Sequence, residues 1–445
     1  MIRQLAPTVR DLLPGRGRSD SMTGNALGMV AGRTAAMGFG FVFWLVAAHV
    51  ATAAQVGFAA AVVSAMMLCT QFAQLGVGSA FISLSPAHRN RPGLLLDVAL
   101  TMTAVGSLLV AAAFLVVARS WLPELGRVSR SPAWTLAFLA MSVAGTVGIV
   151  LDQVNVGLDR GIQVVTRTSA FGALTLVPLV GLPLAGMRMT SLRLFSFWVA
   201  AGIGATLVGL WQLWRTTPAA STGAVALEGA GQRRNGYRYR PRWEPTLVRR
   251  MATVGVANHL LTLCERVPGL VLPVVVTELL SAEANAVWYI VWMSAWVVFT
   301  APVSVGIALF AEASKQPQSA AQATRTALRV CLLYAGSGAL VLAVLADPVL
   351  RLLGHRYAEA GVTPLRALLL GVLPLAVVSS YYARCRASGR LGEAIAAAAL
   401  GGVAAVAVPA AVGLRHGLTG MALAWVGVEA LVACWAGVRL WTARR

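Results

Sequence analysis

Twelve apolar segments follow one another along this chain, and each is long enough to cross a membrane as a helix. A spanning helix needs about 20 mostly apolar residues. Overall, 58% of the residues are hydrophobic and only 12% are charged, whereas soluble domains carry about 25% charged residues. The sequence therefore predicts an all-α polytopic membrane protein rather than a soluble globule. The twelve segments are 24–49, 55–84, 94–118, 133–156, 162–186, 192–214, 251–276, 285–310, 327–346, 364–383, 392–413 and 418–438.

The distribution of basic residues predicts how the segments are oriented. Of the 36 Lys and Arg residues, 24 lie in the N-terminal tail, the C-terminal tail and the loops on the same side, and four lie within segments. Cytoplasmic loops carry an excess of Lys and Arg, so both termini are predicted to be cytoplasmic, in a multi-pass protein of the cytoplasmic (inner or plasma) membrane. The eight basic residues on the opposite side are Arg119, Arg127, Arg130, Arg188, Arg193, Arg351, Arg356 and Arg415.

The only long hydrophilic connection, 215–250, divides the segments into two groups of six. We therefore expect a cytoplasmic tail at 1–23, a six-helix lobe at 24–214, a basic interlobe loop at 215–250 and a second six-helix lobe and short tail at 251–445. A faint repeat relates the halves, with Gly78 matching Gly306. Six spans return the chain to the same side, so the lobes should be related by an axis along the membrane normal. Such an architecture favours a transporter with a cleft between its lobes.

Several other function classes find no support in the sequence. The five cysteines are dispersed without metal-ligand spacing, and no phosphate-binding G-x-x-x-x-G-K-[ST] loop occurs, so we expect no metal and no cofactor. The basic and aromatic stretch 233–242 could bind RNA. Because it lies in a loop on the basic side, we interpret it instead as a contact for anionic membrane lipids, with no nucleic-acid partner.

Three short patterns lie in the first two segments. They read Gly-Met-Val-Ala-Gly-Arg33, then Ala-Gln55-Val-Gly57-Phe-Ala, then Ala-Gln74-Leu-Gly76-Val-Gly78-Ser-Ala-Phe-Ile. The chain resembles the oligosaccharide flippases of the multidrug/oligosaccharidyl-lipid/polysaccharide exporter (MOP) superfamily in these patterns, in its two groups of six segments and in its basic interlobe loop.

The resemblance implies a MATE-like, V-shaped pair of six-helix lobes whose first, second, seventh and eighth helices line a central cavity. It further implies a non-enzymatic flippase that moves a polyprenyl-pyrophosphate-linked oligosaccharide by alternating access. That activity would serve cell-surface polysaccharide or lipopolysaccharide biosynthesis, with the polysaccharide assembly machinery as a partner.

Charged residues deep in the apolar segments are candidates for the substrate site, because a charge at the bilayer centre costs about 2.5–3.5 kcal/mol or more. Arg33 and Arg266 lie near the middle of the first and seventh segments, and Glu265 precedes Arg266. Adjacent residues on a helix point about 100° apart, so Arg266 can face the cavity while Glu265 meets a partner such as Arg33. The alternative is an ion pair that only fixes helix packing. Pro268 predicts a kink beside this pair.

Three further polar residues are candidates with an open alternative. Glu429, in the last segment, suits proton or sodium coupling, or is a neutral carboxylic acid hydrogen-bonded between helices. Gln71 and Gln74 suit sugar hydroxyls, or serve as polar contacts between helices. Asp97, Asp152 and Arg167 lie near cytoplasmic helix ends, where we expect their side chains to reach toward the headgroups.

Two other functions remain as alternatives. A membrane-embedded polysaccharide polymerase or glycosyltransferase would need catalytic groups in an outer loop, and the largest, 119–132 and 347–363, offer Glu124, Asp347 and Glu359 without a convincing pairing. A multidrug/cation antiporter of the same superfamily is disfavoured by arginines in the cavity, which attract anions.

Overall fold

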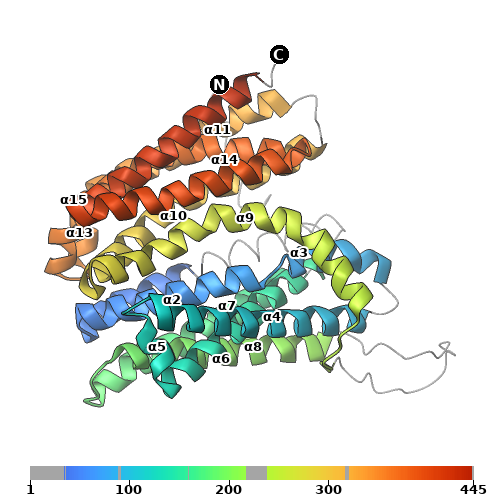
Figure 1. Ribbon diagram of the computed structural model, residues 1–445, viewed down its shortest axis with the longest axis horizontal. Helices are drawn as coiled ribbons and strands as arrows, with labels where there is room; N and C mark the ends of the chain where they lie inside the picture. Colours follow the sequence, from blue (N-terminus) through green and yellow to red (C-terminus); the bar gives the residue numbers. More distant parts are fainter. Residues whose placement is uncertain are drawn as a thin grey trace, which may run out of the picture.

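A computed structural model describes residue 35 and residues 37–88, 92–158, 160–216, 238–315 and 320–442. All regular structure in these ranges is helical (Figure 1). A helix over Met37–Val50 comes first. The others are α2 (Ala53–Ala73), α3 (Val77–Leu84), the 3-10 helix η2 (Ser85–His88), α4 (Pro92–Trp121), α5 (Gly126–Arg130), α6 (Pro132–Gly157), α7 (Gly161–Leu184), α8 (Ser191–Thr216), α9 (Pro245–Leu279), α10 (Ala282–Lys315), α11 (Ala320–Val344), α12 (Ala346–Arg351), α13 (His355–Leu369), α14 (Val372–Ala387) and α15 (Leu391–Thr442).

The apolar helices confirm a multi-pass membrane protein. Within the described residues, nine helices are long and apolar enough to cross a membrane, or ten if the bent pair α13–α14 is one span. The 52-residue α15 contains non-helical backbone at Gly417, where two helices meet. The first predicted segment begins outside the described residues, so the count of twelve spans stays a prediction.

Two predicted segments differ from the helices in the structure. The segment 55–84 is interrupted after α2, where Leu75 and Gly76 adopt positive φ angles of 45° and 71°. The segment 364–383 is replaced by α13 and α14, which meet at an angle of 43°. Apolar composition does not reveal either break, because each interruption is a change of backbone direction within a run that stays apolar.

The predicted outer loop 347–363 is also helical over much of its length. It forms α12 and the first half of α13. Arg366, which we expected inside a span, lies in α13 and its Nε donates a hydrogen bond to the carbonyl oxygen of Ala343, at 3.0 Å.

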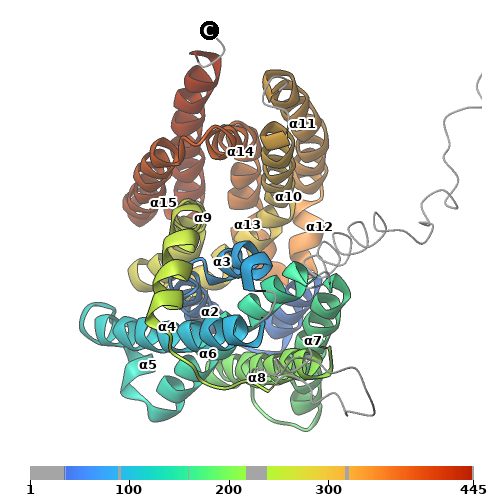
Figure 2. The same ribbon diagram turned by 90° about the vertical axis from the view of Figure 1, so that its right-hand side faces the viewer.

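The helices pack as two bundles, seen along the helix axes in Figure 2. The N-terminal bundle contains Met37–Val50 and α2 to α8, and the C-terminal bundle contains α9 to α15. Gly78 and Gly306 occupy equivalent places in the two: a Cβ at Gly78 would meet Gln153 of α6, and one at Gly306 would meet Ser379 of α14. The weak sequence repeat therefore corresponds to a shared helix contact.

The bundles meet along α2, α3, α9 and α10. Near α5, a Cβ at Gly57 would overlap the backbone of Ala282, so α2 and α10 touch directly there. The helix Met37–Val50 also reaches the interface, where the Trp44 ring packs edge to face on the ring of Tyr289 in α10, with ring centroids 5.0 Å apart. We call the membrane face that carries α5 and the α9–α10 turn the α5 end, and the opposite face the α3 end.

The last part of the interlobe connection is fixed to the N-terminal bundle. Oδ1 of the buried Asp97 accepts a hydrogen bond from the backbone N–H of Arg240 at 3.0 Å, and its Oδ2 lies 3.6 Å from Nε of Arg242. The Tyr239 hydroxyl lies 2.9 Å from the Thr101 hydroxyl. The expectation that Asp97 reaches toward the headgroups is therefore wrong, because its carboxylate anchors the chain just before α9.

Asp152 and Arg167 also have partners within the protein instead of reaching toward the headgroups. They form an ion pair between α6 and α7, in which Arg167 Nε donates to Asp152 Oδ1 at 2.6 Å. Each carboxylate or guanidinium thus has a partner inside the bundle, which removes the need to reach the headgroup region.

The predicted orientation can be tested by labelling single cysteines in a variant that lacks the natural ones. A cysteine at Ser131, which follows α5, should react with an impermeant thiol reagent in intact cells, because the α5 end is predicted to face outward. A cysteine at Ser221 should be protected until the cells are opened. Labelling of Ser221→Cys in intact cells would reverse the orientation.

Candidate functional site

One face of α9 points at the N-terminal bundle. The backbones of Gly255 and Gly76 approach so closely that a Cβ on either would overlap the other residue. One turn later, His259 Nε2 lies 2.8 Å from the carbonyl oxygen of Gln71. Arg266 follows His259 by seven residues, which returns it to the same face of the helix.

Arg266 is exposed on this face. It interacts electrostatically with both His259 and Glu265. Helix periodicity thus places Arg266 on the α9 face that is directed at the other bundle. Arg33, the second predicted cation, lies outside the described residues.

Glu265 turns away from this face, into the C-terminal bundle. Its carboxylate lies 3.1 Å from the guanidinium of Arg386 in α14, which also approaches the Thr262 hydroxyl at 3.5 Å. The partner that the sequence suggested for Glu265 was Arg33. The partner in the structure is Arg386, which carried no sequence signal because α14 is remote in the chain. α9 continues through Pro268 and is visibly curved (Figure 1).

Glu429 lies in the same part of the C-terminal bundle. It is half-buried in the second part of α15. The Tyr382 hydroxyl of α14 interacts electrostatically with both Glu429 and Glu265. Two carboxylates, Glu265 of α9 and Glu429 of α15, thus lie near Tyr382 and Arg386 of α14.

Gln71 and Gln74 are buried where α2 ends, 8% and 7% exposed. Nε2 of Gln74 has no hydrogen-bond partner among the described residues. In this conformation neither side chain offers much surface to a sugar, and their position beside α9 suits a contact between the bundles.

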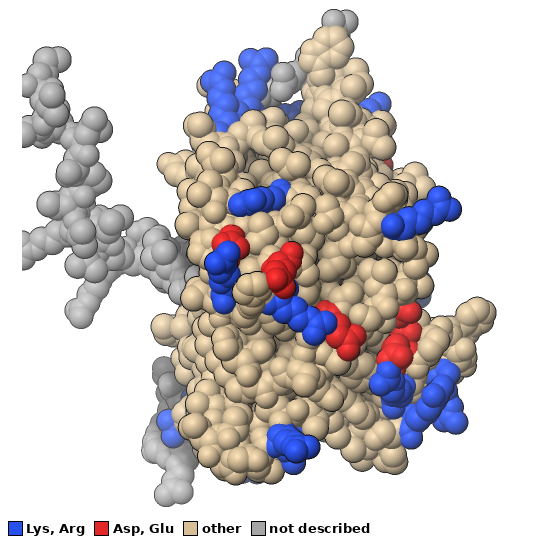
Figure 3. All heavy atoms as spheres, turned by 90° about the vertical axis from the view of Figure 1, so that its left-hand side faces the viewer, with Lys and Arg blue, Asp and Glu red and all other residues tan. Residues whose placement is uncertain are grey.

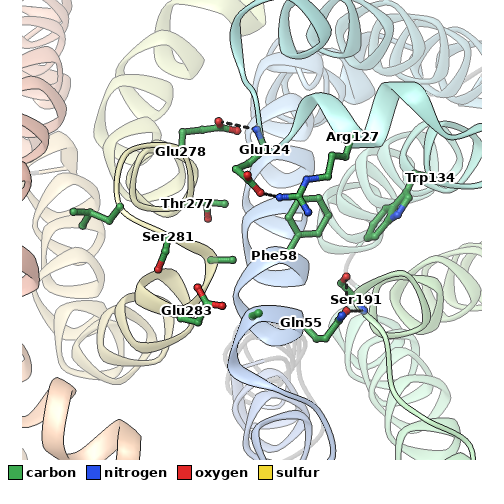
Figure 4. Close-up of a pocket in the computed structure, with 13 residues that line it drawn as sticks. Gln55, Phe58, Glu124, Arg127, Trp134, Ser191, Thr277, Glu278, Ser281 and Glu283 are labelled. Carbon is green, nitrogen blue, oxygen red and sulfur yellow. Dashed lines mark hydrogen bonds and ion pairs between the residues drawn. The ribbon is translucent and has the colours of Figure 1, made fainter.

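A second candidate site lies between the bundles at the α5 end. A cavity of about 500 Å³ opens there (Figure 4), and both bundles contribute to its wall. Its acidic residues are Glu124, Glu278 and Glu283. The remaining lining residues are Ala54, Gln55, Phe58, Arg127, Trp134, Ser191, Thr277, Leu280, Ser281 and Ala282.

Two hydrogen-bonded contacts join the bundles beside this cavity. The Glu278 carboxylate of α9 accepts the backbone N–H groups of Glu124, at 3.0 Å, and Leu125, at 2.7 Å. Asn285 Nδ2 of α10 donates to the carbonyl oxygen of Gly57 at 2.8 Å, in a fully buried setting. No sequence pattern points to Glu278, because its partners are backbone groups of a turn about 153 residues away in the chain.

The α5 end has a mixed charge pattern. Acidic and basic side chains are interspersed on this face, with uncharged surface between them (Figure 3). Many of them pair locally: Arg127 with Glu124, Arg351 with Asp347 and His355 with Glu359. Among the described residues, no group of three or more His, Cys, Asp and Glu side chains could hold a metal ion.

The arrangement resembles solved transporter structures. No protein-family model and no curated protein sequence matches the chain. The lipid II flippase MurJ in an inward closed conformation is similar with a TM-score of 0.68 and 13% identity, over 94% of this chain and 88% of that one. An inward-facing multidrug resistance MATE transporter of the MOP superfamily gives 0.64 and 14%, over 91% and 94%. An outward-facing MATE transporter gives 0.65 and 13%, over 96% and 97%.

These similarities confirm the fold. The chain shares the fold of these structures, which are MATE transporters and the MurJ flippase. The resemblance read from the segments around Gly57 and Gly76 is thereby confirmed at the level of the fold.

Proposed function

We propose that this protein is a flippase that moves a polyprenyl-pyrophosphate-linked oligosaccharide across the cytoplasmic membrane by alternating access of its two bundles, for cell-surface polysaccharide or lipopolysaccharide synthesis. The observation that carries the proposal is Arg266, exposed at mid-helix on the α9 face directed at the N-terminal bundle. A pyrophosphate crossing a bilayer needs fixed cations because its desolvation is costly, and arginine stays protonated and binds phosphate oxygens in pairs. The fold and the MurJ neighbour support the same conclusion.

The proposal also covers the other residues of the substrate site and the partners of the protein. Arg33, Glu265, Gln71 and Gln74 complete the proposed substrate site, either directly or by holding Arg266 in place. Anionic lipids are the proposed partners of the basic interlobe loop, and the polysaccharide assembly machinery supplies and removes the substrate. The chain itself carries out no bond chemistry in this proposal.

A flipping assay tests the function directly. The purified protein is reconstituted in liposomes with a fluorescent polyprenyl-pyrophosphate oligosaccharide, and an impermeant quencher reports the fraction in the outer leaflet. Protein-dependent equilibration between the leaflets without ATP is expected. If the pyrophosphate-linked lipid never equilibrates while an organic cation is carried, the antiporter function replaces this one.

The antiporter of multidrug or other cations is the second candidate, supported by the MATE neighbours and by the acidic residues at α9 and α15. Glu429 tests the ion coupling that both candidates could use. Glu429→Gln removes the charge and the titrating group at nearly constant size, so transport should lose its dependence on a proton or sodium gradient while substrate binding remains. A gradient response equal to that of the unmodified protein would assign Glu429 a packing role.

The polymerase or glycosyltransferase alternative has less support. Its candidate acids pair with neighbouring bases: Asp347 Oδ2 lies 2.9 Å from Arg351 Nε, and Glu359 Oε1 lies 3.1 Å from His355 Nδ1. Both carboxylates line one cavity of about 400 Å³, but each is engaged by its own base, which leaves neither free to act as a general acid or base on a sugar.

A further inference from the structure

Most polar side chains that line the cavity at the α5 end already have partners within the protein. Gln55 Oε1 accepts from Ser191, the Thr277 hydroxyl donates to the Pro273 carbonyl oxygen, and the Ser281 hydroxyl accepts the N–H of Ala284. Arg127 pairs with Glu124 and covers the Phe58 ring at 5.3 Å. A lining whose hydrogen bonds are already made within the protein offers a ligand few free groups, so the cavity is better explained as the junction between two moving bodies.

Glu278 is the residue that ties these bodies together at the rim. Its carboxylate reaches from the last turn of α9 to two consecutive backbone N–H groups, one to each oxygen. Figure 4 shows the first of these hydrogen bonds, to Glu124. Hydrogen bonds to an ionised group are stronger than neutral ones. The donors, the N–H groups of Glu124 and Leu125, lie in the turn that precedes α5. Helix α5 in turn packs on α4 and α6 of the N-terminal bundle.

We propose that Glu278 is a latch that holds the two bundles together at the α5 end, and that its two hydrogen bonds must break before substrate can pass that end. The deeper Asn285–Gly57 hydrogen bond is fully buried, whereas the Glu278 contact lies at the mouth of the cavity and is only partly buried. Solvent reaches the rim contact first, so opening begins there. The proposal rests on the alternating access of the proposed function, but it can be tested without substrate.

Distance measurements between spin labels would detect opening. Labels are attached to cysteines at Ala133 of α6 and Ala360 of α13, exposed alanines on either side of the junction, in full-length protein that lacks its natural cysteines, in lipid nanodiscs. We expect Glu278→Ala to add a longer-distance population and to raise the ratio of open to closed protein about tenfold, which corresponds to about 1.4 kcal/mol. Glu278→Gln, which keeps the size but loses the charge, should give a smaller shift.

Glu283→Ala is the matched control, because Glu283 lines the same cavity and has no described hydrogen bond to the N-terminal bundle. It should leave the distance distribution unchanged. Equal distributions for the parent protein, Glu278→Ala and Glu278→Gln would overturn the latch, as would an equal shift in Glu283→Ala. If flipping fails in liposomes but Glu278→Ala still opens the junction, the latch stands and the proposed substrate is wrong.

Discussion

Replacing Arg266 with alanine is expected to slow the flipping of lipid-linked oligosaccharide about 100-fold or more while the protein still inserts and folds. Charged hydrogen bonds contribute about 1.5–3 kcal/mol each, and each 1.36 kcal/mol of barrier changes a rate tenfold. Loss of a paired contact with pyrophosphate therefore accounts for at least two orders of magnitude. Arg266→Lys should recover part of the rate, because lysine keeps the charge but not the planar pair of donors. Flipping is measured in liposomes containing equal amounts of each variant.

The Glu265–Arg386 pair gives a control in the same region. Arg386→Ala leaves the Glu265 carboxylate without its 3.1 Å partner, so it should lower the thermal stability. Replacing both residues with apolar ones should restore the thermal stability, since ion pairs withdrawn from solvent often tolerate such an exchange. If Arg266→Ala flips substrate at the parent rate, Arg266 is not in the substrate site. The same assay on Arg33→Ala tests the second candidate cation, which lies near the middle of the first predicted segment.

The sequence predicted the membrane helices well because their signal is local. A long run of apolar residues identifies a span wherever its neighbours lie. The breaks at Leu75–Gly76 and between α13 and α14 were not predictable, since they depend on which helix packs against the turn. Gly76 illustrates this: the resemblance marked it as one of several small residues, but only its contact with Gly255 shows why a side chain is excluded there.

The site was predicted less completely, for a related reason. The position of Arg266 in an apolar segment identified it as a candidate, and helix periodicity predicted a different direction for Glu265, whose carboxylate pairs with Arg386. Periodicity says which face a residue occupies but not what lies opposite. Arg386, Tyr382 and the backbone amides that bind Glu278 are therefore found only in three dimensions. The same holds for the partners of Asp97, which come from the interlobe connection.

The second large effect is expected at Gly255. The α2–α3 junction and α9 touch through the backbones of Gly76 and Gly255, and a Cβ at Gly255 would overlap the Gly76 carbonyl. Forcing extra atoms into a packed contact costs about 1–3 kcal/mol. This cost applies only when the bundles meet at the α3 end. It should therefore destabilise the conformation that is closed at the α3 end and leave the other conformations of the transport cycle unaffected. We expect Gly255→Leu to lower the flipping rate about tenfold or more, with Gly255→Ala intermediate.

Gly427→Leu provides the comparison, because a Cβ at this exposed glycine of α15 meets nothing within 4 Å. It adds the same atoms to a helix without touching the other bundle, so flipping should stay near the parent rate. Gly76→Ala should be more harmful than Gly255→Ala, since Gly76 also has a φ of 71°, a conformation that strains residues with a side chain. Alternating access requires the α3 end to close once in every cycle. Parent-like flipping by Gly255→Leu would mean that the cycle proceeds without this contact, and that closure at the α3 end depends on other parts of α3 and α9.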